Sequence, residues 1–202
     1  MRFSAGVSRL RTGLRWTRWP ACAIAAGAAG ALLAQVYFAA PQTRRRPTEY
    51  EVEAAYLYNF GKFVRWPPST PRSGKLFPIC VLGQDPFGPI LDATVADEAV
   101  NGKEVVAKRI SSLEAAAGCR ILFIGSSERK QMEQILNQAD KMEVLTVSDA
   151  PRFLQEGGMI EFVLIQDHVR FEVNLTAARR AGLDLSSELL KVATRVITRK
   201  AS

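Results

Sequence analysis

Residues 48–67, TEYEVEAAYLYNFGKFVRWP, form a segment whose beginning, buried face and end can all be predicted from local chemistry. Thr48 and Glu51 have the spacing of a capping box, in which each side chain accepts a hydrogen bond from the other residue's backbone N–H. The acidic residues that follow favour a helix start, because they lie near the positive end of the helix dipole. The two prolines that follow Trp66 disfavour helical backbone there and remove two N–H donors. We therefore predict a helix that begins after Thr48 and ends near Arg65.

Apolar residues recur within this segment at helical spacing, and they are Val52, Tyr56, Phe60 and Phe63. Residues three and four positions apart share one face of a helix, so the pattern predicts a helix packed against a core. A functional interpretation is also open. In that interpretation, residues off the stripe or at its end belong to a binding surface, namely Tyr58, Asn59, Lys62 and Trp66.

The formal net charge of the 202-residue chain is +7, but most of this charge precedes the predicted domain. Residues 1–40 contain five arginines and no acidic residue, and residues 44–46 are three further arginines. Without these eight positive charges, residues 47–202 have a net charge of −1. A nucleic-acid-binding protein usually presents a strongly basic face. The charge balance therefore argues against nucleic acid as a partner.

Residues 1–40 have the pattern of an export signal, with a basic stretch followed by an uncharged, alanine-rich run and small residues. We predict a signal peptide over 1–40, a linker over 41–47 and one domain over 48–202. The uncharged run from Trp19 to Thr43 is long enough to span a bilayer, so an uncleaved anchor remains an alternative. Both interpretations place the domain in the periplasm, either free or anchored in the inner membrane.

Three cysteines are present, and Cys22 lies in the leader. The remaining pair, Cys80 and Cys119, is expected to form a disulfide in an oxidising compartment. Two buried free thiols are the alternative, because both residues lie in apolar, strand-like runs where cysteine acts as a small hydrophobe.

Apolar runs of strand length alternate with short helical patterns through the rest of the chain. This alternation predicts an α/β fold, a three-layer sandwich with a mostly parallel mixed sheet and a C-terminal antiparallel hairpin. We expect the hairpin turn at Asp167 and His168. The predicted strands are 76–82, 103–109, 119–124, 144–147, 159–166 and 169–174. The predicted helices after the first are 86–94, 112–117, 128–140, 151–157 and an interrupted one through 183–192.

Sets of residues typical of catalysis are sparse, so we predict that the protein is not an enzyme and needs no metal or cofactor. His168 is the only histidine, and no serine lies in a G-x-S-x-G motif. The turn from Gly83 to Gly88 follows a strand, but it lacks the spacing of a phosphate-binding loop. Carboxylates at strand ends could act as an acid/base pair, although surface solvation is the simpler interpretation of each. They are Asp149, Glu161 and Glu172.

Five blocks together resemble the YfiR family of bacterial periplasmic proteins. In chain order they are YEVEAAYLYNFGKFVRWP, ICVLGQDPFG, CRILFIGSSE, VLTVSDAPRFLQEGGMIEFVL and VRFEVNLTAARRAGLDLSSELLKVA. The resemblance covers about residues 50–193. It implies a non-enzymatic regulator that represses an inner-membrane diguanylate cyclase by binding the periplasmic part of that cyclase, and so modulates cyclic di-GMP and biofilm formation.

The resemblance also implies a disulfide at the positions of Cys80 and Cys119. A second cysteine pair found in the better-studied type of the family is missing here, because residues 151–166 contain no cysteine. This departure puts in doubt any redox switch at that place.

Our candidate partner-binding residues are Tyr58, Trp66 and Arg170, and a homodimer is possible. One alternative function is a periplasmic small-ligand binder or enzyme with a cleft at the carboxyl ends of the strands, where open α/β sheets bind ligands. A pocket lined by Asp149, Arg170 and Asn174 would favour it. A second alternative is an outer-surface or assembly module.

Overall fold

The computed structural model describes residues 48–68 and 74–198, which include nearly all of the predicted domain. The predicted signal peptide over 1–40 and the linker over 41–47 lie outside these residues. Within the described ranges, no helix is long and apolar enough to cross a membrane.

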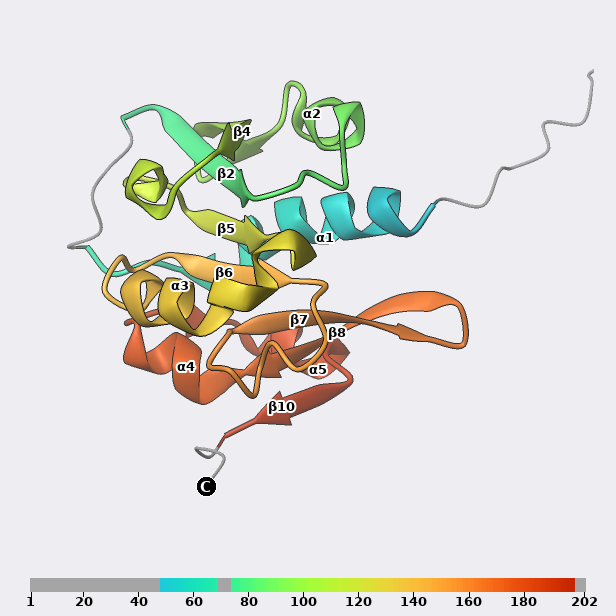
Figure 1. Cartoon of the computed structure of the whole chain (residues 1–202). Helices are drawn as coiled ribbons and strands as arrows, with labels where there is room; N and C mark the ends of the chain where they lie inside the picture. The colour runs from blue at the N-terminus through green and yellow to red at the C-terminus, as the bar shows by residue number, and fades with distance from the viewer. Residues whose placement is uncertain (1–47, 69–73, 199–202) are drawn as a thin grey trace, which may run out of the picture. The chain divides into compact units, whose positions relative to one another are not determined.

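An eight-stranded mixed sheet forms the centre of the domain (Figure 1). Its spatial order is β10-β8-β7-β6-β5-β2-β4-β3, and the five strands from β7 to β4 are mutually parallel. The strands are β2 (Leu76–Leu82), β3 (Ala99–Val100), β4 (Lys103–Ile110), β5 (Ile121–Ile124), β6 (Leu145–Ser148), β7 (Ile160–Ile165), β8 (His168–Asn174) and β10 (Arg195–Ile197). The predicted fold class, a sandwich around a mostly parallel sheet with an antiparallel hairpin, is confirmed.

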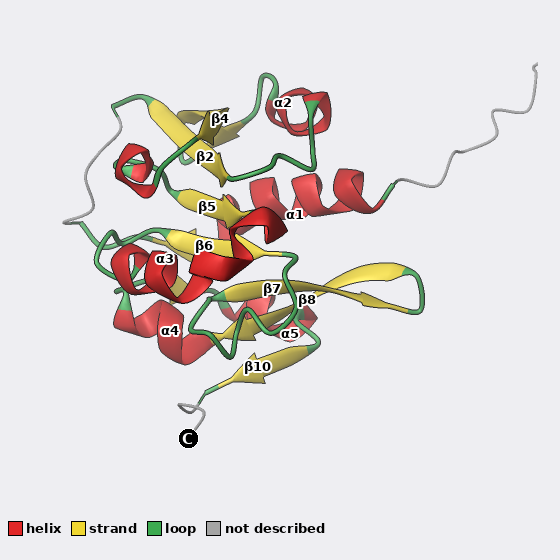
Figure 2. Ribbon diagram, viewed as in Figure 1, coloured by secondary structure: helices red, strands yellow, loops and turns green. Residues whose placement is uncertain are grey.

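Helices cover both faces of this sheet, as Figure 2 shows. Alternate residues of β2 belong to two separate cores: Ile79 and Val81 pack with one group of helices, and Cys80 and Leu82 pack with the other. The first group is α1 (Glu49–Phe63), α2 (Pro89–Val95), α4 (Leu175–Arg180) and α5 (Ser187–Val192). The second group is η1 (Leu113–Ala116) and α3 (Met132–Ala139), which follows the 3₁₀ turn η2 (Ser126–Gln131). Side chains that alternate between the faces of a strand therefore produce three layers.

Helix α1 begins with the predicted capping box. The Thr48 N–H donates to Glu51 Oε2 at 2.5 Å, and the Glu51 N–H donates to Thr48 Oγ1 at 3.3 Å. The helix ends at Phe63, two residues before the predicted end. Val64 and Arg65 instead form β1, which pairs antiparallel with β9 (Asp184–Leu185). This pairing holds Val64 in an extended conformation. Because the partner strand is distant in sequence, the residues around Val64 do not predict the pairing.

The buried face of α1 differs from the predicted stripe. The side chains it buries most deeply on the sheet include Ala54, Leu57 and Phe60, while Phe63 is 39% exposed. Gly61 also faces the core, where a Cβ atom would lie 3.0 Å from the Phe77 ring. The stripe prediction is confirmed at Phe60, which is fully buried, and at Val52 and Tyr56, which pack against the core, but it was wrong at Phe63.

Cys80 of β2 and Cys119, just before β5, form a disulfide with a Cα–Cα distance of 6.0 Å. This distance is ordinary for a disulfide. The bridge joins two neighbouring parallel strands on the face that packs with α3.

Several other helices and strands differ in their bounds from the prediction. The helix predicted from Pro86 begins at Pro89, because Asp85 Oδ1 accepts the Phe87 N–H and closes a turn first. Residues 151–157 form turns rather than a helix. Of the interrupted helix predicted through 183–192, residues 187–192 form α5 and residues 184–185 form β9, while α4 and β10 on either side were not predicted. These short elements depend on contacts with distant strands, so local periodicity could not reveal them.

Candidate functional site

The β7–β8 hairpin presents apolar side chains to solvent. Its two-residue turn is Gln166 and Asp167, both with positive φ (51° and 58°), which is the backbone of a type I′ turn. The turn therefore lies one residue earlier than predicted. At the end of β7, directly before the turn, Leu164 is 54% exposed and Ile165 is 43% exposed. Two neighbouring exposed apolar side chains make the hairpin tip a candidate contact surface.

The hairpin extends past the neighbouring strands, which leaves its outer half without further pairing in the described sheet (Figure 1). Strand β6 pairs with β7 only at Ile160 and Glu161, and β10 pairs with β8 only from Glu172 to Asn174. The residues nearer the turn pair with each other, with Ile165 opposite His168 and Val163 opposite Arg170. Directly opposite residues share a face of the ladder, so Arg170 lies on the same face as Ile165.

Of the three candidate partner-binding residues, Tyr58 lies in the core. Its side chain is only 9% exposed, its hydroxyl donates to the Glu98 carboxylate, and Lys62 Nζ lies 3.9 Å from the ring centroid. The expectation that Tyr58 faces solvent is therefore wrong. The spacing of Ala54, Leu57 and Tyr58 was the available signal, since these residues share one helical face.

Trp66 is half-buried beside a pocket of about 560 Å³. The indole Nε1–H donates to the Arg120 carbonyl at 3.2 Å, and the ring meets Phe77 edge-on at 5.4 Å between centroids. Arg65 and Lys103 also line this pocket. It opens beside the first residues of β4 and just before β5, at the amino ends of the parallel strands. A smaller pocket of about 230 Å³ lies beside Leu82 and Ser111, at the carboxyl ends of β2 and β4, which is where the alternative function expected a cleft.

A further, apolar pocket of about 350 Å³ lies between α1 and α5. Asn59 and Phe63 line it from α1, and Val192, which is 62% exposed, lines it from α5. Asp149, Arg170 and Asn174, which we expected to line a cleft together, line none of these three pockets.

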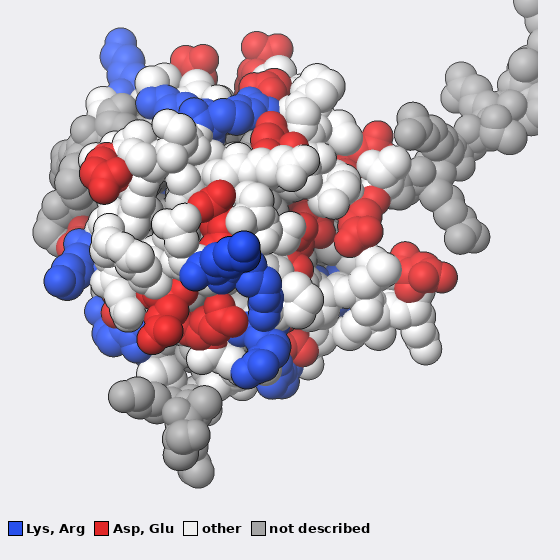
Figure 3. Space-filling model, viewed as in Figure 1, with Lys and Arg blue, Asp and Glu red and all other residues white. Residues whose placement is uncertain are grey.

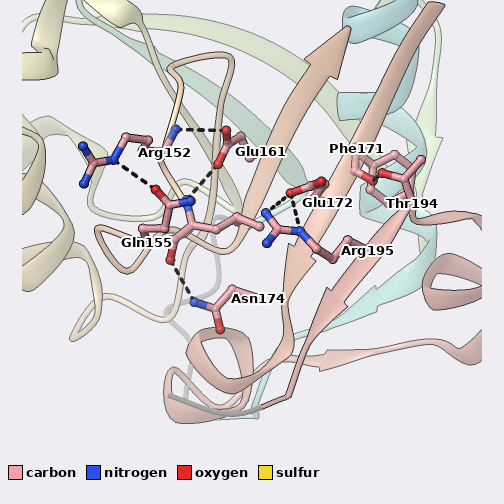
Figure 4. Close-up of polar contacts among 9 residues, drawn as sticks. Arg152, Gln155, Glu161, Phe171, Glu172, Asn174, Thr194 and Arg195 are labelled. Atoms are coloured by element: carbon pink, nitrogen blue, oxygen red, sulfur yellow. Dashed lines mark hydrogen bonds and ion pairs between the residues drawn. The ribbon is translucent and has the colours of Figure 1, made fainter. Parts of the chain in front are cut away.

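The carboxylates at the strand ends of β7 and β8 have structural partners (Figure 4). Glu161 is buried and accepts the backbone N–H groups of Arg152 (3.1 Å) and Leu154 (3.0 Å). Glu172 forms an ion pair with Arg195 of β10. Both carboxylates thus hold neighbouring segments in place, which argues against the acid/base pair considered from the sequence.

Asn174 is similarly engaged. Its Nδ2 donates to the Leu154 carbonyl at 3.2 Å, and its Oδ1 accepts the Ala177 N–H and so caps α4. Among the described residues, no group of three or more His, Cys, Asp and Glu side chains is placed to hold a metal ion. Positive and negative side chains are interspersed on the face drawn in Figure 3.

Two solved structures share the fold. A conserved domain protein from Vibrio cholerae O1 biovar El Tor matches with a TM-score of 0.51 and 11% identity, covering 74% of this chain and 60% of that protein. An ABC domain in complex with L-Trp from Streptococcus pneumonia matches with a TM-score of 0.51 and 12% identity, covering 71% of this chain and 60% of that one. The chain therefore spans about 60% of the length of each structure. At these identities the likeness shows the fold alone.

A family model identifies the chain itself. The model described as YfiR/HmsC-like matches residues 50–194, which is most of the chain and nearly the same range as the resemblance found from the motifs. By this match, the chain belongs to the YfiR/HmsC-like family.

Proposed function

We propose that this domain represses an inner-membrane diguanylate cyclase by binding the cyclase's periplasmic segment through the β7–β8 hairpin. Family membership supports the class of regulator, a periplasmic protein of cyclic di-GMP signalling. The observation that carries the choice of surface is the exposure of Leu164 and Ile165 on a hairpin whose outer half pairs with no other described strand. Regulation by binding requires no catalytic group.

The chemistry of the hairpin suits a protein partner. Burying one large aliphatic side chain contributes about 1.5–3 kcal/mol. Leu164 and Ile165 are consecutive strand residues whose side chains lie on opposite faces of the hairpin, so a partner has to enclose the tip of the hairpin to bury both. Exposed polar residues surround them, with Gln166 and Asp167 at the turn and Arg170 on the face of Ile165. An apolar centre with a polar rim is the usual anatomy of a protein interface. The unpaired edges of the hairpin can also accept an extended strand of the partner.

The test replaces the two anchors, as Leu164→Ser with Ile165→Ser, in cells that express the cyclase. We expect cyclic di-GMP and surface attachment to rise as they do when the gene is deleted, while the melting temperature of the purified protein stays near wild type. Val192→Ser is the matched control, because Val192 is also exposed and apolar but lies on α5. If repression persists in the Leu164→Ser, Ile165→Ser variant and is lost in Val192→Ser, the interface lies on α5 and not on the hairpin. Unchanged cyclic di-GMP on deletion would end the repressor proposal.

A second candidate function, small-ligand binding, is favoured by the Trp66 pocket. An aromatic wall beside Arg65 and Lys103 suits a ligand with a flat ring and an anionic group. Trp66 is the only tryptophan after the predicted leader, so its fluorescence reports directly on this pocket. Saturable quenching by aromatic carboxylates, lost in Lys103→Gln, would support this function, and linear quenching unaffected by the substitution would refute it.

A further inference from the structure

The pocket of about 230 Å³ at the carboxyl ends of β2 and β4 has a polar lining from η1, η2 and α3. Its polar side chains are two serines, two glutamates (Glu114 and Glu128) and three glutamines (Gln131, Gln134 and Gln138). Its buried side chains are apolar and belong to the core beneath it, namely Leu82, Leu113 and Ile135. Ligands of open α/β sheets usually bind at this edge, so the pocket is a candidate binding site.

Both carboxylates of the pocket are oriented by a neighbouring serine. Ser127 Oγ accepts the Gln84 N–H at 2.9 Å and donates to Glu128 Oε1 at 3.1 Å, which ties Glu128 to the turn after β2. In η1, hydrogen bonds from the Ser112 side chain and then from the Glu114 backbone lower the pKa of Glu114. The pocket is therefore lined by two carboxylates whose positions are set by hydrogen bonds.

The charges in this lining are of one sign. Of the described residues that line the pocket, only the two glutamates are charged, and none is a lysine, an arginine or an aromatic residue. Lys130 and Lys141, which flank α3, line the neighbouring pocket on the outer side of that helix. A concave surface with one sign of charge concentrates ions of the opposite sign. The pocket therefore disfavours anions and favours a cation.

The three glutamines indicate which kind of cation fits. They are spaced by three and four residues, so they lie along one side of α3. Each amide has both donors and an acceptor, which is what a hydroxyl group pairs with, whereas a metal ion would use only the amide oxygens. Pockets for drug-sized ligands measure about 300–1,000 Å³, so this smaller one suits a ligand of about the size of one sugar ring.

We propose that this pocket binds a small ammonium compound with several hydroxyl groups, of the chemical class of the amino sugars. The ammonium group donates to Glu114 and Glu128, and the hydroxyl groups pair with the amides of Gln131, Gln134 and Gln138. The site is separate from the β7–β8 hairpin and from the Trp66 pocket, and its test does not depend on the proposed repression.

The experiment titrates the full chain with glucosamine, at a slightly acidic pH that keeps the amine protonated, and follows the side-chain amide signals of Gln134 and Gln138 by NMR. Glucose, with a hydroxyl in place of the ammonium group, and methylammonium, with the charge but no hydroxyl, are the matched probes. We expect saturable shifts with glucosamine and about tenfold weaker binding of each matched probe, because each lacks one set of hydrogen bonds. Equal binding of glucose, equal binding of methylammonium or a lack of saturable shifts with glucosamine would overturn the proposal.

Substitutions on the same helical segment locate the site. Glu128→Gln should weaken glucosamine binding about tenfold, because it removes a charged acceptor. Glu133→Gln removes the same charge from α3 but lies at the neighbouring pocket, so it should leave binding unchanged. Gln134→Ala should weaken binding, whereas Asn137→Ala, an amide that lines only the neighbouring pocket, should not. None of these four side chains is buried, so the fold should persist in each variant. If the two glutamate variants lose affinity equally, the attraction is a general charge effect and the proposed site is refuted.

Discussion

Glu161 and Glu172 lie directly opposite each other in the β7–β8 ladder, so two carboxylates share one face of the hairpin. Like charges in this position destabilise a sheet unless something offsets them. Here the structure provides two different partners: backbone N–H groups of residues 152 and 154 for Glu161, and the Arg195 guanidinium for Glu172. Arg195 belongs to β10, so this ion pair also joins the last strand to the sheet.

We therefore predict that Arg195→Gln lowers the free energy of unfolding by about 1 kcal/mol, the upper end for an exposed ion pair, because the loss of Arg195 leaves the two carboxylates facing each other. Urea denaturation measures the effect. Adding Glu172→Gln should recover part of the loss, since it removes the repulsion. Lys108→Gln, an exposed strand position on β4, is the control and should change little. If the two changes at Arg195 and Glu172 simply add, the Arg195–Glu172 ion pair makes no net contribution. If adding Glu172→Gln recovers nothing, the repulsion between the two carboxylates is negligible.

A second prediction concerns pH and Glu53. The pKa of Glu53 is about 8 in the folded protein, above the ordinary value of 4.5, so the folded state binds more protons than the unfolded state between these values. Its contribution to stability is therefore fully present below about pH 4.5 and declines as pH rises through 8, with a slope of at most about 1.4 kcal/mol per pH unit.

Glu53→Gln should flatten this decline and make the protein more stable than wild type at pH 8. Thermal or urea unfolding at pH 5, 7 and 9 measures it, with Glu133→Gln as the exposed control. A wild-type stability that rises from pH 5 to pH 9, or an unchanged pH profile in Glu53→Gln, would contradict the prediction.

The sequence predicted well those features that depend on neighbours along the chain. The capping box of Thr48 and Glu51 and the strand at Leu76–Leu82 are of this kind. Features that depend on distant segments were missed. The two-residue strands at Val64–Arg65 and Asp184–Leu185 exist because they pair with each other, and no local pattern encodes that pairing.

The predictions of site residues also succeed or fail according to whether the environment of each residue depends on distant segments. Arg170 is exposed, as a partner-binding residue has to be, and its role in binding stays a prediction. Tyr58 was misplaced because its hydroxyl finds a partner, Glu98, that is 40 residues away. The burial of Glu53 was overlooked, since a glutamate in the first turns of a helix is normally explained by the helix dipole.

A third prediction concerns Gly61 on the buried side of α1. A Cβ atom there would lie 3.0 Å from two carbons of the Phe77 ring and 3.1 Å from Val100 Cγ2, closer than carbon atoms normally pack. We expect Gly61→Ala to lower stability by about 1–3 kcal/mol through overpacking, despite the gain of up to about 1 kcal/mol in helix propensity.

Chemical denaturation of Gly61→Ala, and of the same change combined with Phe77→Leu, tests this prediction. The smaller leucine should relieve the contact, so the double variant should lose less stability than the sum of the two single changes. A Gly61→Ala variant that is more stable than wild type would show that α1 can move away from the sheet at no cost.

The last prediction concerns the disulfide between Cys80 and Cys119. Both residues are buried, with 0% and 4% exposure, and the bridge closes a loop of 39 residues. Because the crosslink limits the conformations of the unfolded chain, replacing both cysteines by alanine should lower the free energy of unfolding by roughly 3–4 kcal/mol in the loop-entropy model. The same loss should appear when wild type is denatured in urea with a reductant present. Since the sulfur atoms are shielded, reduction of the native protein should be slow without urea and fast near the unfolding midpoint. Equal urea midpoints with and without reductant would show that the two cysteines are free thiols in the protein.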